Sequence, residues 1–224
     1  MRHGYLLSTL LLVAATAHAG VIINGTRLVY QGDKKESSLG LSNPDATDYL
    51  VQSWVDSGGK NLAKAPFLIT PPLFRLDAKE DNVLRVVRTG GNLPEDRESL
   101  YWLNIKAIPS SKHVEGINTL QIAINTRIKL LYRPSSVKGN PEEVADKLEW
   151  HREGNDLVVN NPTPFYMNFQ KVMLNGHKVD KATWAVPETE THFALPGNVS
   201  GSTIAYSIIT DYGSISQTWS KSVH

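Results

Sequence analysis

The 224-residue sequence contains no cysteine, and aromatic residues make up only 8% of it. Without cysteine there is no disulfide framework, so the core has to be stabilised by packing alone. Excess charge is missing as well, because 23 Lys and Arg residues oppose 22 Asp and Glu residues, for a formal net charge of +1. This balance, with no basic cluster, argues against nucleic-acid binding.

Local signatures of catalysis are also absent. The sequence has no Gly-x-Ser-x-Gly elbow, no phosphate-binding Gly-Lys loop and no Gly-x-Gly-x-x-Gly fingerprint. Its seven histidines form no short-range pair, so we expect neither a metal ion nor a cofactor. Carboxylates could still converge in space, and a hydrolytic enzyme therefore stays an alternative that turnover of any substrate would establish.

The first nineteen residues contain one short apolar run. A basic start at Arg2 precedes apolar residues from Tyr5 to Ala15, and small residues follow up to Ala19. The run is shorter than the roughly 20 residues that span a bilayer, so residues 1–19 are predicted to be a cleaved signal peptide. The mature chain would begin at Gly20 and work outside the cytoplasm, without insertion into a membrane.

Short segments rich in β-branched and aromatic residues alternate with turn signals along the rest of the chain. The expected strands are 26–30, 49–55, 67–70, 82–87, 100–107, 120–132, 157–160, 166–174, 192–194 and 203–211. One short helix is expected at 141–148, where Pro-Glu-Glu is a helix-start signature. This spacing predicts an all-β protein made of antiparallel sandwiches.

The length suits two β-domains of about 100 residues each. We place the boundary in the segment 135–141, which gives an N-terminal domain of residues 20–138 and a C-terminal domain of residues 139–224. Thr70-Pro71-Pro72 stands at the end of an expected strand, and a cis peptide bond at one of these prolines is a further hypothesis.

One expected strand, within residues 118–134, is much longer than the common strand of about 5–6 residues. Leu120, Ile122 and Ile124 fall on one side of it, and polar or small residues fall on the other. This apolar row could belong to the core of its own sandwich. It could equally lie at a sheet edge and be lent to another chain, and periodicity does not separate the two interpretations.

Six blocks of the sequence carry a family resemblance. In chain order they are TRLVY at 26–30, ITPPLF at 69–74, LPEDRESLYW at 93–102, RIKLLYRP at 127–134, NPTPFY at 161–166 and TDYG at 210–213. Together they resemble the PapD-like periplasmic pilus chaperones of the chaperone/usher pathway, especially those of type 1-like fimbriae. The segment from Pro109 to Thr119 is short. In this respect the chain resembles the class of these chaperones that has a short loop before the strand lent to the pilus subunit, the donor strand.

The resemblance implies a boomerang of two immunoglobulin-like sandwiches with a cleft between them. It also implies a periplasmic chaperone, not an enzyme, which binds, folds and caps pilus subunits by donor-strand complementation and delivers them to an outer-membrane usher. Carried over residue by residue, the donated positions are Asn118, Leu120, Ile122 and Ile124. Self-association of the free form through this donor strand is a further expectation.

In the same family an Arg of the first strand and a Lys of the long strand bind the terminal carboxylate of the pilus subunit. These positions match Arg27 and Lys129, which without the resemblance would be interpreted as solvated strand ends. Simple alternation puts Lys129 on the face opposite Ile122, so that strand twist or a bulge would be needed to aim both at one client.

Glu98, Arg133 and Asp211 match a charge cluster that fixes the angle between the domains in these chaperones. Without the resemblance, they would be separate surface charges. The alternative function is a generic two-domain adhesion or binding module with no chaperone role. Such a module would keep the apolar row at positions 120, 122 and 124 inside its own core, so exposure of these side chains discriminates between the two functions.

Overall fold

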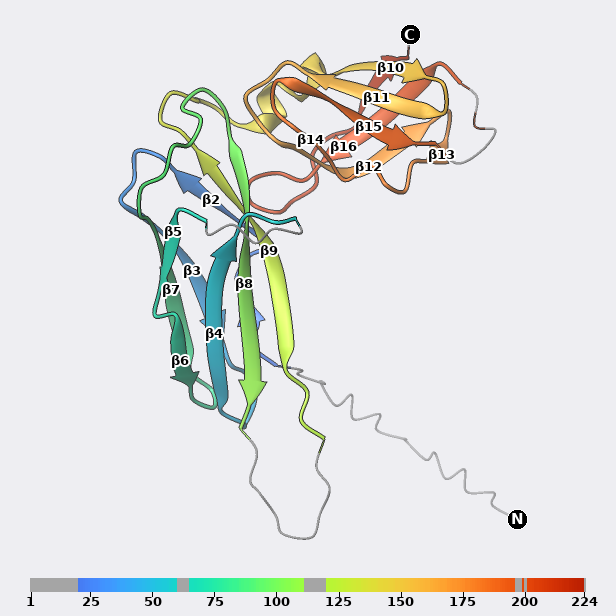
Figure 1. The fold of residues 1–224 in the computed structure, drawn as a ribbon. Helices are drawn as coiled ribbons and strands as arrows, with labels where there is room; N and C mark the ends of the chain where they lie inside the picture. The colour runs from blue at the N-terminus through green and yellow to red at the C-terminus, as the bar shows by residue number, and fades with distance from the viewer. Residues whose placement is uncertain (1–19, 60–64, 111–119, 196–198, 200, 224) are drawn as a thin grey trace, which may run out of the picture.

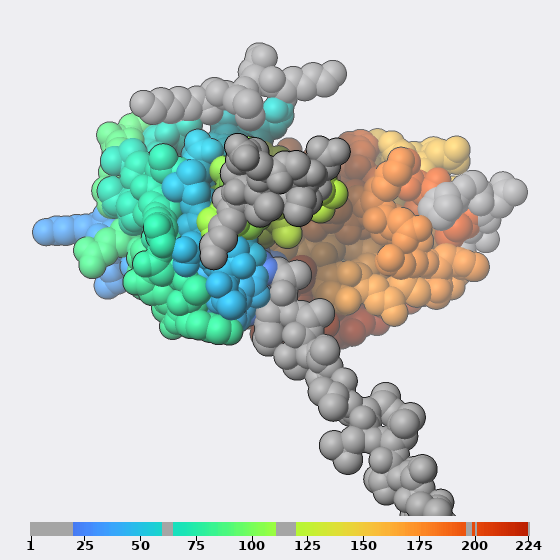
Figure 2. All heavy atoms as spheres, turned by 90° about the horizontal axis from the view of Figure 1, so that it is seen from below, coloured from blue at the N-terminus to red at the C-terminus, as the bar shows by residue number. Residues whose placement is uncertain are grey.

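The computed structural model describes residues 20–59, 65–110, 120–195, 199 and 201–223, and the signal peptide expected at 1–19 lies outside them. Strands dominate the described chain and form two β-sandwiches, which confirms the all-β prediction (Figure 1). The second sandwich lies across one end of the first and projects to one side, as the expected boomerang does (Figures 1 and 2).

The first sandwich consists of a four-stranded and a five-stranded sheet. The four-stranded sheet has the order β1 (Ile22–Ile23), β3 (Glu36–Ser42), β7 (Asp81–Arg88) and β5 (Phe67–Thr70). The five-stranded sheet has the order β2 (Arg27–Gln31), β9 (Ile124–Arg133), β8 (Ser99–Pro109), β4 (Tyr49–Asp56) and β6 (Leu73–Leu76). Neighbouring strands are antiparallel except for β2 and β9, which are parallel.

The second sandwich is built in the same way from shorter strands. One sheet has the order β10 (Glu149–Glu153), β11 (Asp156–Asn161) and β15 (Thr189–Ala194). The other has the order β13 (His177–Lys178), β12 (Met167–Leu174), β16 (Thr203–Ile208) and β17 (Trp219–Ser222), with β14 (Trp184–Ala185) also paired to β12. All of these pairs are antiparallel.

Each sandwich has its own apolar core. The first core takes its buried side chains from residues 28–132 and the second from residues 137–208. In the second, the rings of Trp150, Phe169 and Tyr206 contact one another with centroids 5.3, 5.5 and 6.1 Å apart. Packed aromatic rings supply much buried apolar area, so close packing accounts for stability without disulfides.

Two local predictions have different outcomes. The short helix expected at 141–148 is confirmed only as two separate 3₁₀ helices, Pro141–Glu143 and Ala145–Lys147, and not as one continuous helix. Val144 between them, with φ −128° and ψ 5°, does not continue a helix. The hypothesis of a cis proline is confirmed at the Thr70–Pro71 bond.

Strand β9 positions the functional features. It runs from the far end of the first sandwich up to the junction with the second (Figure 1). Its first residue, Ile124, lies at the far end, and its last, Arg133, lies at the junction, where it contacts Asp211 of the second sandwich. A single strand therefore connects the apolar row with the interdomain cleft.

Candidate functional site

Residues 124–128 of β9 have a partner strand on one side only. Strand β8 pairs with β9 from Ile124 to Tyr132, whereas β2 joins on the other side only at Lys129. Within the described part of the chain, no strand lies beside the second edge of residues 124–128. Backbone groups at such an edge can pair with an incoming strand.

The apolar row at the start of this edge is exposed. Leu120, Ile122 and Ile124 have 88%, 64% and 50% of their surface accessible. Side chains two residues apart share one face of a strand, and Ile128 and Leu130 continue this face into the first core. The row therefore extends the core-facing side of β9 beyond the end of the sandwich.

The sequence pattern placed the start of this strand too early. The paired strand begins at Ile124, so the prediction of a strand from residue 120 is wrong at that end. Leu120 and Ile122 precede the ladder, and Asn118 lies outside the described residues. The interpretation in which the row is buried in its own core is also wrong, because all three side chains of the row are exposed.

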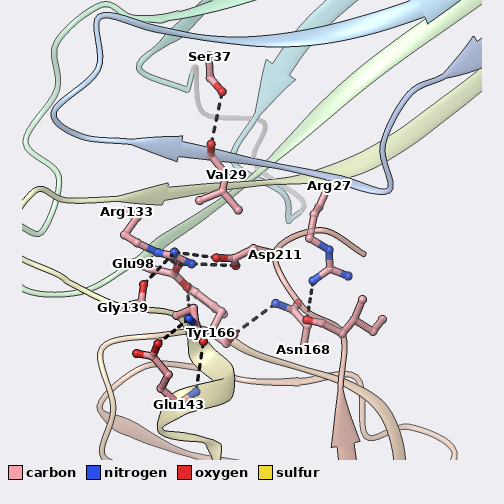
Figure 3. Close-up of polar contacts among 12 residues, drawn as sticks. Arg27, Val29, Ser37, Glu98, Arg133, Gly139, Glu143, Tyr166, Asn168 and Asp211 are labelled. Atoms are coloured by element: carbon pink, nitrogen blue, oxygen red, sulfur yellow. Dashed lines mark hydrogen bonds and ion pairs between the residues drawn. The ribbon is translucent and has the colours of Figure 1, made fainter. Parts of the chain in front are cut away.

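The parallel register of β2 and β9 places Arg27 directly opposite Lys129. Nη1 of Arg27 donates a hydrogen bond to the Ile209 carbonyl at 3.2 Å, and its buried Nε has no partner among the described residues (Figure 3). The Lys129 ammonium donates to the side-chain oxygen of Asn168 and lies 4.4 Å from the centroid of the Trp184 ring. Over the described ranges, neither cation has a carboxylate within ion-pair distance.

Both cations line an open cleft of about 380 Å³ between the sandwiches. Ile209 and Ile215 of the second sandwich form part of the opposite wall. Arg127 also lines this cleft, but it is neutralised by Asp56 at 2.5 Å. The unneutralised charge in the cleft is therefore that of Arg27 and Lys129.

The surroundings disfavour the charged forms of these two groups. Burial, together with the nearby positive charge of Arg27, lowers the pKa of Lys129 to about 8. Burial also lowers the pKa of Arg27, although the carboxylates of Asp211, Glu142 and Glu98 act against this effect. An anion between the two cations would reduce their repulsion and form charge-assisted hydrogen bonds. This geometry suits a carboxylate.

Regular alternation along β9 determines the face of the strand on which Lys129 projects. The β8–β9 register is continuous from Ile124 to Tyr132, without a bulge. Lys129 therefore projects on the face opposite Ile122 and Ile124, toward the cleft. The register shows no bulge to redirect Lys129, and the row and the cation lie at different places along the strand.

Arg133 lies at the centre of a second charged cluster at the junction, with 3% of its surface exposed (Figure 3). Its two terminal nitrogens bind Asp211 at 2.8 and 2.9 Å, and its Nε donates to Glu98 at 2.8 Å. The other Glu98 oxygen accepts the backbone N–H of Tyr166 at 2.8 Å. Asp211 and Tyr166 belong to the second sandwich, so the cluster links both. The interpretation as separate surface charges is wrong.

Opposing effects act on the ionisation of this cluster. Burial raises the pKa of Glu98 to about 7, against the attraction of Arg133 and the hydrogen bond from Tyr166. Burial lowers the pKa of Arg133, but the hydrogen bonds and charges of Asp211 and Glu98 outweigh it and raise the net value. A buried ion pair needs its remaining hydrogen bonds satisfied, as they are here, and losing one partner would leave an uncompensated charge.

Sequence reasoning missed two residues that contact Lys129. Asn168 is 3% exposed and stands between the core residues Met167 and Phe169, and an amide in that setting is a signal for a buried polar contact. Trp184 reaches Lys129 from the short strand β14, which the sequence pattern did not predict. Its ring also contacts Trp102 of the first sandwich, with centroids 6.2 Å apart.

Neither metal-binding clusters nor spanning helices are found in what the structure describes. No three His, Asp or Glu side chains of those residues gather closely enough to hold a metal ion. Likewise, the described ranges contain no helix that is long and apolar enough to cross a bilayer. The free edge, the apolar row and the cationic cleft are therefore the features on which a function can be argued.

Comparisons with known sequences give consistent matches. The N-terminal domain of PapD, a pili and flagellar-assembly chaperone, matches residues 20–138, and the C-terminal domain of the pili assembly chaperone PapD matches residues 143–220. A curated relative, the probable fimbrial chaperone LpfB of Escherichia coli, is 43% identical over 218 residues. That alignment covers 96% of this chain and 94% of LpfB.

Solved structures agree with this match. The Salmonella enterica SafA pilin in complex with the SafB chaperone contains a chain that is 40% identical, with a TM-score of 0.84, covering 93% of this chain and 98% of that one. The Escherichia coli chaperone DraB is 38% identical with a TM-score of 0.82, covering 92% of this chain and 97% of DraB. Similarity over nearly the whole length includes both sandwiches, which are immunoglobulin-like domains.

Proposed function

Because the chain belongs to the PapD family of pilus-assembly chaperones, we propose that it binds, folds and caps pilus subunits and delivers them to an outer-membrane usher. Members of this family are chaperones and not enzymes. The observation that carries the proposal is the exposed apolar row of Leu120, Ile122 and Ile124, which leads into the free edge of β9. An unpaired strand edge with an apolar row suits a client that lacks one strand of its own sandwich.

Donor-strand complementation would use both the free edge of β9 and the apolar row. The free backbone groups of residues 124–128 would pair with a strand of the subunit, as in β-strand addition. The three exposed side chains would enter the subunit's apolar groove, where each full burial is worth about 1.5–3 kcal/mol. Asn118 completes the proposed set of donated positions and lies outside the described residues.

Arg27 and Lys129 would bind the terminal carboxylate of the subunit. Lys129 lies five residues after Ile124, or about 17 Å of extended strand, so a fixed carboxylate determines which client residues lie beside the row. Two unit charges 4 Å apart attract by roughly 4 kcal/mol at an effective dielectric of 20, before desolvation is subtracted. The anchor would therefore set the register of the client as well as its affinity.

The cluster of Glu98, Arg133 and Asp211 would keep the two domains at the angle that the cleft requires. Support comes from its burial and from its bonds to both sandwiches. We assign residues 20–138 to the subunit-binding domain and residues 139–224 to the C-terminal domain. The hinge segment between them would then be short and held at both ends by this cluster.

The family places the protein in the periplasm, and its route there is part of the proposal. We assign residues 1–19 to a signal peptide that is removed after Ala19. The free form is expected to self-associate through the donor strand, since its apolar row and unpaired edge are exposed until a subunit covers them. Size-exclusion chromatography with and without a subunit would detect this exchange.

Replacing Ile122 with Asp tests the proposal. Because Ile122 is exposed, the substitution should change the free energy of unfolding by no more than about 0.5 kcal/mol. Capture of the pilus subunit should weaken at least about 30-fold, since an apolar contact is lost and a charge enters an apolar groove. Affinity would be measured with the subunit that co-purifies with the exported protein.

The matched control is Asn125→Asp, which adds the same charge on the other side of the strand, one residue beyond Ile124. It should retain capture within about threefold, because position 125 does not point into the client groove. Equal capture by the two variants would contradict the donor-strand mechanism. Failure of Ile122→Asp to fold would instead indicate that the row belongs to the core.

A further inference from the structure

The backbone nitrogen of Gly20 is held by a carboxylate at the far end of the first sandwich. It lies 3.0 Å from Oδ2 of Asp45, and the Tyr49 hydroxyl donates to the same oxygen at 2.7 Å. The backbone N–H of Asp45 in turn donates to Oδ1 of Asn43 at 3.1 Å, which fixes the loop that presents the carboxylate. The acceptor is therefore positioned independently of Gly20.

This contact lies directly beside the apolar row. Gly20, Asp45 and Tyr49 line a cavity of about 300 Å³ together with Ile122 and Ile124. A methyl carbon added to Gly20 would lie 3.9 Å from Cδ1 of Ile124, so the backbone at Gly20 packs against the start of β9. Gly20, Val21 and Ile23 thus form one wall of the cavity beneath the proposed donor strand.

We propose that Asp45 and Tyr49 form a binding site for the mature N-terminus, which the α-ammonium group of Gly20 occupies only after the signal peptide has been removed. The inference rests on the proposed cleavage after Ala19. Signal peptidase hydrolyses the Ala19–Gly20 bond with one water; Ala19 leaves with a new carboxylate, and Gly20 keeps the amine, which takes up a proton. A neutral N–H donor beside Asp45 thereby becomes a cation, and the hydrogen bond becomes an ion pair.

The local charges favour this pairing. An α-amino group has an ordinary pKa of about 7.7–8.0 and is mostly protonated at neutral pH. Burial and the hydrogen bond to Asp45 raise the pKa of Tyr49 to about 12, so Tyr49 stays neutral well above that range. On the neighbouring loop, the Lys79 ammonium donates to the Pro44 carbonyl. Among the described residues that line the cavity, Asp45 is the acidic group that faces Gly20.

The residue at the new terminus also fits this site. Its nitrogen lies against the Asp45 carboxylate, so the charge that cleavage creates would face an acceptor already in place. The first strand, β1, follows at once and pairs Ile22 with Ser42. An ion pair at Gly20 would therefore fix the start of β1, and with it the wall that supports Ile122 and Ile124.

The stabilisation by the proposed ion pair between Gly20 and Asp45 should depend on pH in a definite direction. A carboxylate at this distance should raise the pKa of the amine above its value in the unfolded chain. The stabilisation is then fully present below the unfolded pKa of about 8 and is lost as the pH rises through the raised folded value. A hydrogen bond from an uncharged amide, as in a chain with one extra residue, would not titrate in this window.

Four proteins test the inference: the full mature chain exported to the periplasm, a chain made in the cytoplasm that begins at Ala19, and the Asp45→Asn form of each. Intact mass would establish the first residue, and the pKa of the terminal amine would be followed by NMR. In the mature chain Asp45→Asn should lower the amine pKa by about one unit, a tenfold change in proton affinity. It should also lower the unfolding temperature at pH 7 by about 4 °C, and by less than half of that at pH 10.

In the chain that begins at Ala19, Asp45→Asn should have a smaller effect that does not vary between pH 7 and 10. Asp33→Asn, which removes an exposed carboxylate of the same domain, should leave the amine pKa unchanged in the mature chain. An equal amine pKa in the mature protein and its Asp45→Asn form would overturn the inference, as would equal losses of stability in both backgrounds or a mature chain that does not begin at Gly20. Subunit capture is scored separately with Ile122→Asp, so a normal amine pKa with intact capture overturns only this inference.

Discussion

Lys129 and Arg133 stand four positions apart on β9 and reach the same junction, but their surroundings differ. Arg133 is enclosed by Glu98 and Asp211, and its charge is fully balanced inside the protein. Among the residues that the structure describes, the hydrogen-bond acceptors of Lys129 and its neighbour Arg27 are neutral. The difference teaches that the Arg133 cluster is complete without a partner protein, whereas Arg27 and Lys129 retain the capacity to bind an anion from outside.

The two halves of β9 also differ in how completely the protein itself pairs and buries them. The half from Lys129 to Arg133 has strands on both sides as far as Tyr132, and its side chains are largely buried. The half from Ile124 to Ile128 has one edge without a partner strand in the described chain, and it begins with exposed side chains. The fold therefore leaves unpaired the segment that the proposed function gives to the client.

The largest effect on stability is expected at the buried cluster, where Arg133 pairs with Glu98 and Asp211. Arg133→Ala should lower the free energy of unfolding by about 3–5 kcal/mol, because it leaves Glu98 buried without its partner. Urea unfolding would measure the loss. Arg97→Ala is the matched control, since Arg97 pairs with Glu188 of the second sandwich at 2.7 Å while both side chains are partly exposed, and its effect on the free energy of unfolding should be far smaller.

Similar losses of stability in Arg133→Ala and Arg97→Ala would contradict the distinction between a buried charge cluster and a partly exposed ion pair. The shape of Arg133→Ala under native conditions gives a second readout. If the cluster fixes the domain angle, small-angle scattering should detect a wider range of interdomain arrangements in this variant than in Arg97→Ala. An unchanged scattering profile in a weakened Arg133→Ala protein would limit the role of the cluster to stability.

A smaller effect, on the affinity for the subunit, is expected from a change of pH that titrates Lys129 in the cleft. The free protein holds Lys129 with a pKa of about 8, so above that pH a proton must be taken up when a carboxylate binds. Affinity for the subunit should therefore be nearly constant below pH 7 and fall about tenfold between pH 7 and 9. Titration calorimetry in buffers of different ionisation enthalpy would measure both the affinity and the proton uptake.

Lys129→Arg is the control for this pH effect, because a guanidinium stays charged throughout the range. Whatever its affinity at pH 7, its profile between pH 7 and 9 should therefore be flat. A parent protein with an equally flat profile would show that protonation of Lys129 does not contribute to capture.

Much of the architecture could be predicted from sequence because it depends on period-two apolar patterns. The expected segment 67–70 coincides with β5, and those at 49–55 and 100–107 lie within one or two residues of β4 and β8. Strand β3, with the sequence ESSLGLS, escaped prediction because its exposed face is polar and it contains a glycine. Its strand conformation is set by pairing with β7.

The site could be predicted only through the family resemblance. The motifs identified Arg27 and Lys129, but not that a parallel register places them opposite each other. Nor could periodicity decide that Ile122 is exposed, because exposure depends on which other parts of the fold cover a side chain, and Ile124 stays half exposed even where β8 pairs with it. Tertiary contacts such as Asn168 with Lys129, between residues far apart in sequence, leave only weak local signals.

The most direct test of the account uses the C-terminal peptide of the captured subunit, made with either a free carboxylate or a terminal amide. Its affinity would be measured for the parent protein and for Lys129→Ala. The account predicts that amidation weakens binding to the parent at least about tenfold, in line with the loss of hydrogen bonds to a charged group. It also predicts that amidation changes binding to Lys129→Ala much less. Equal effects of amidation on both proteins would contradict the assignment of this cation to the client's carboxylate.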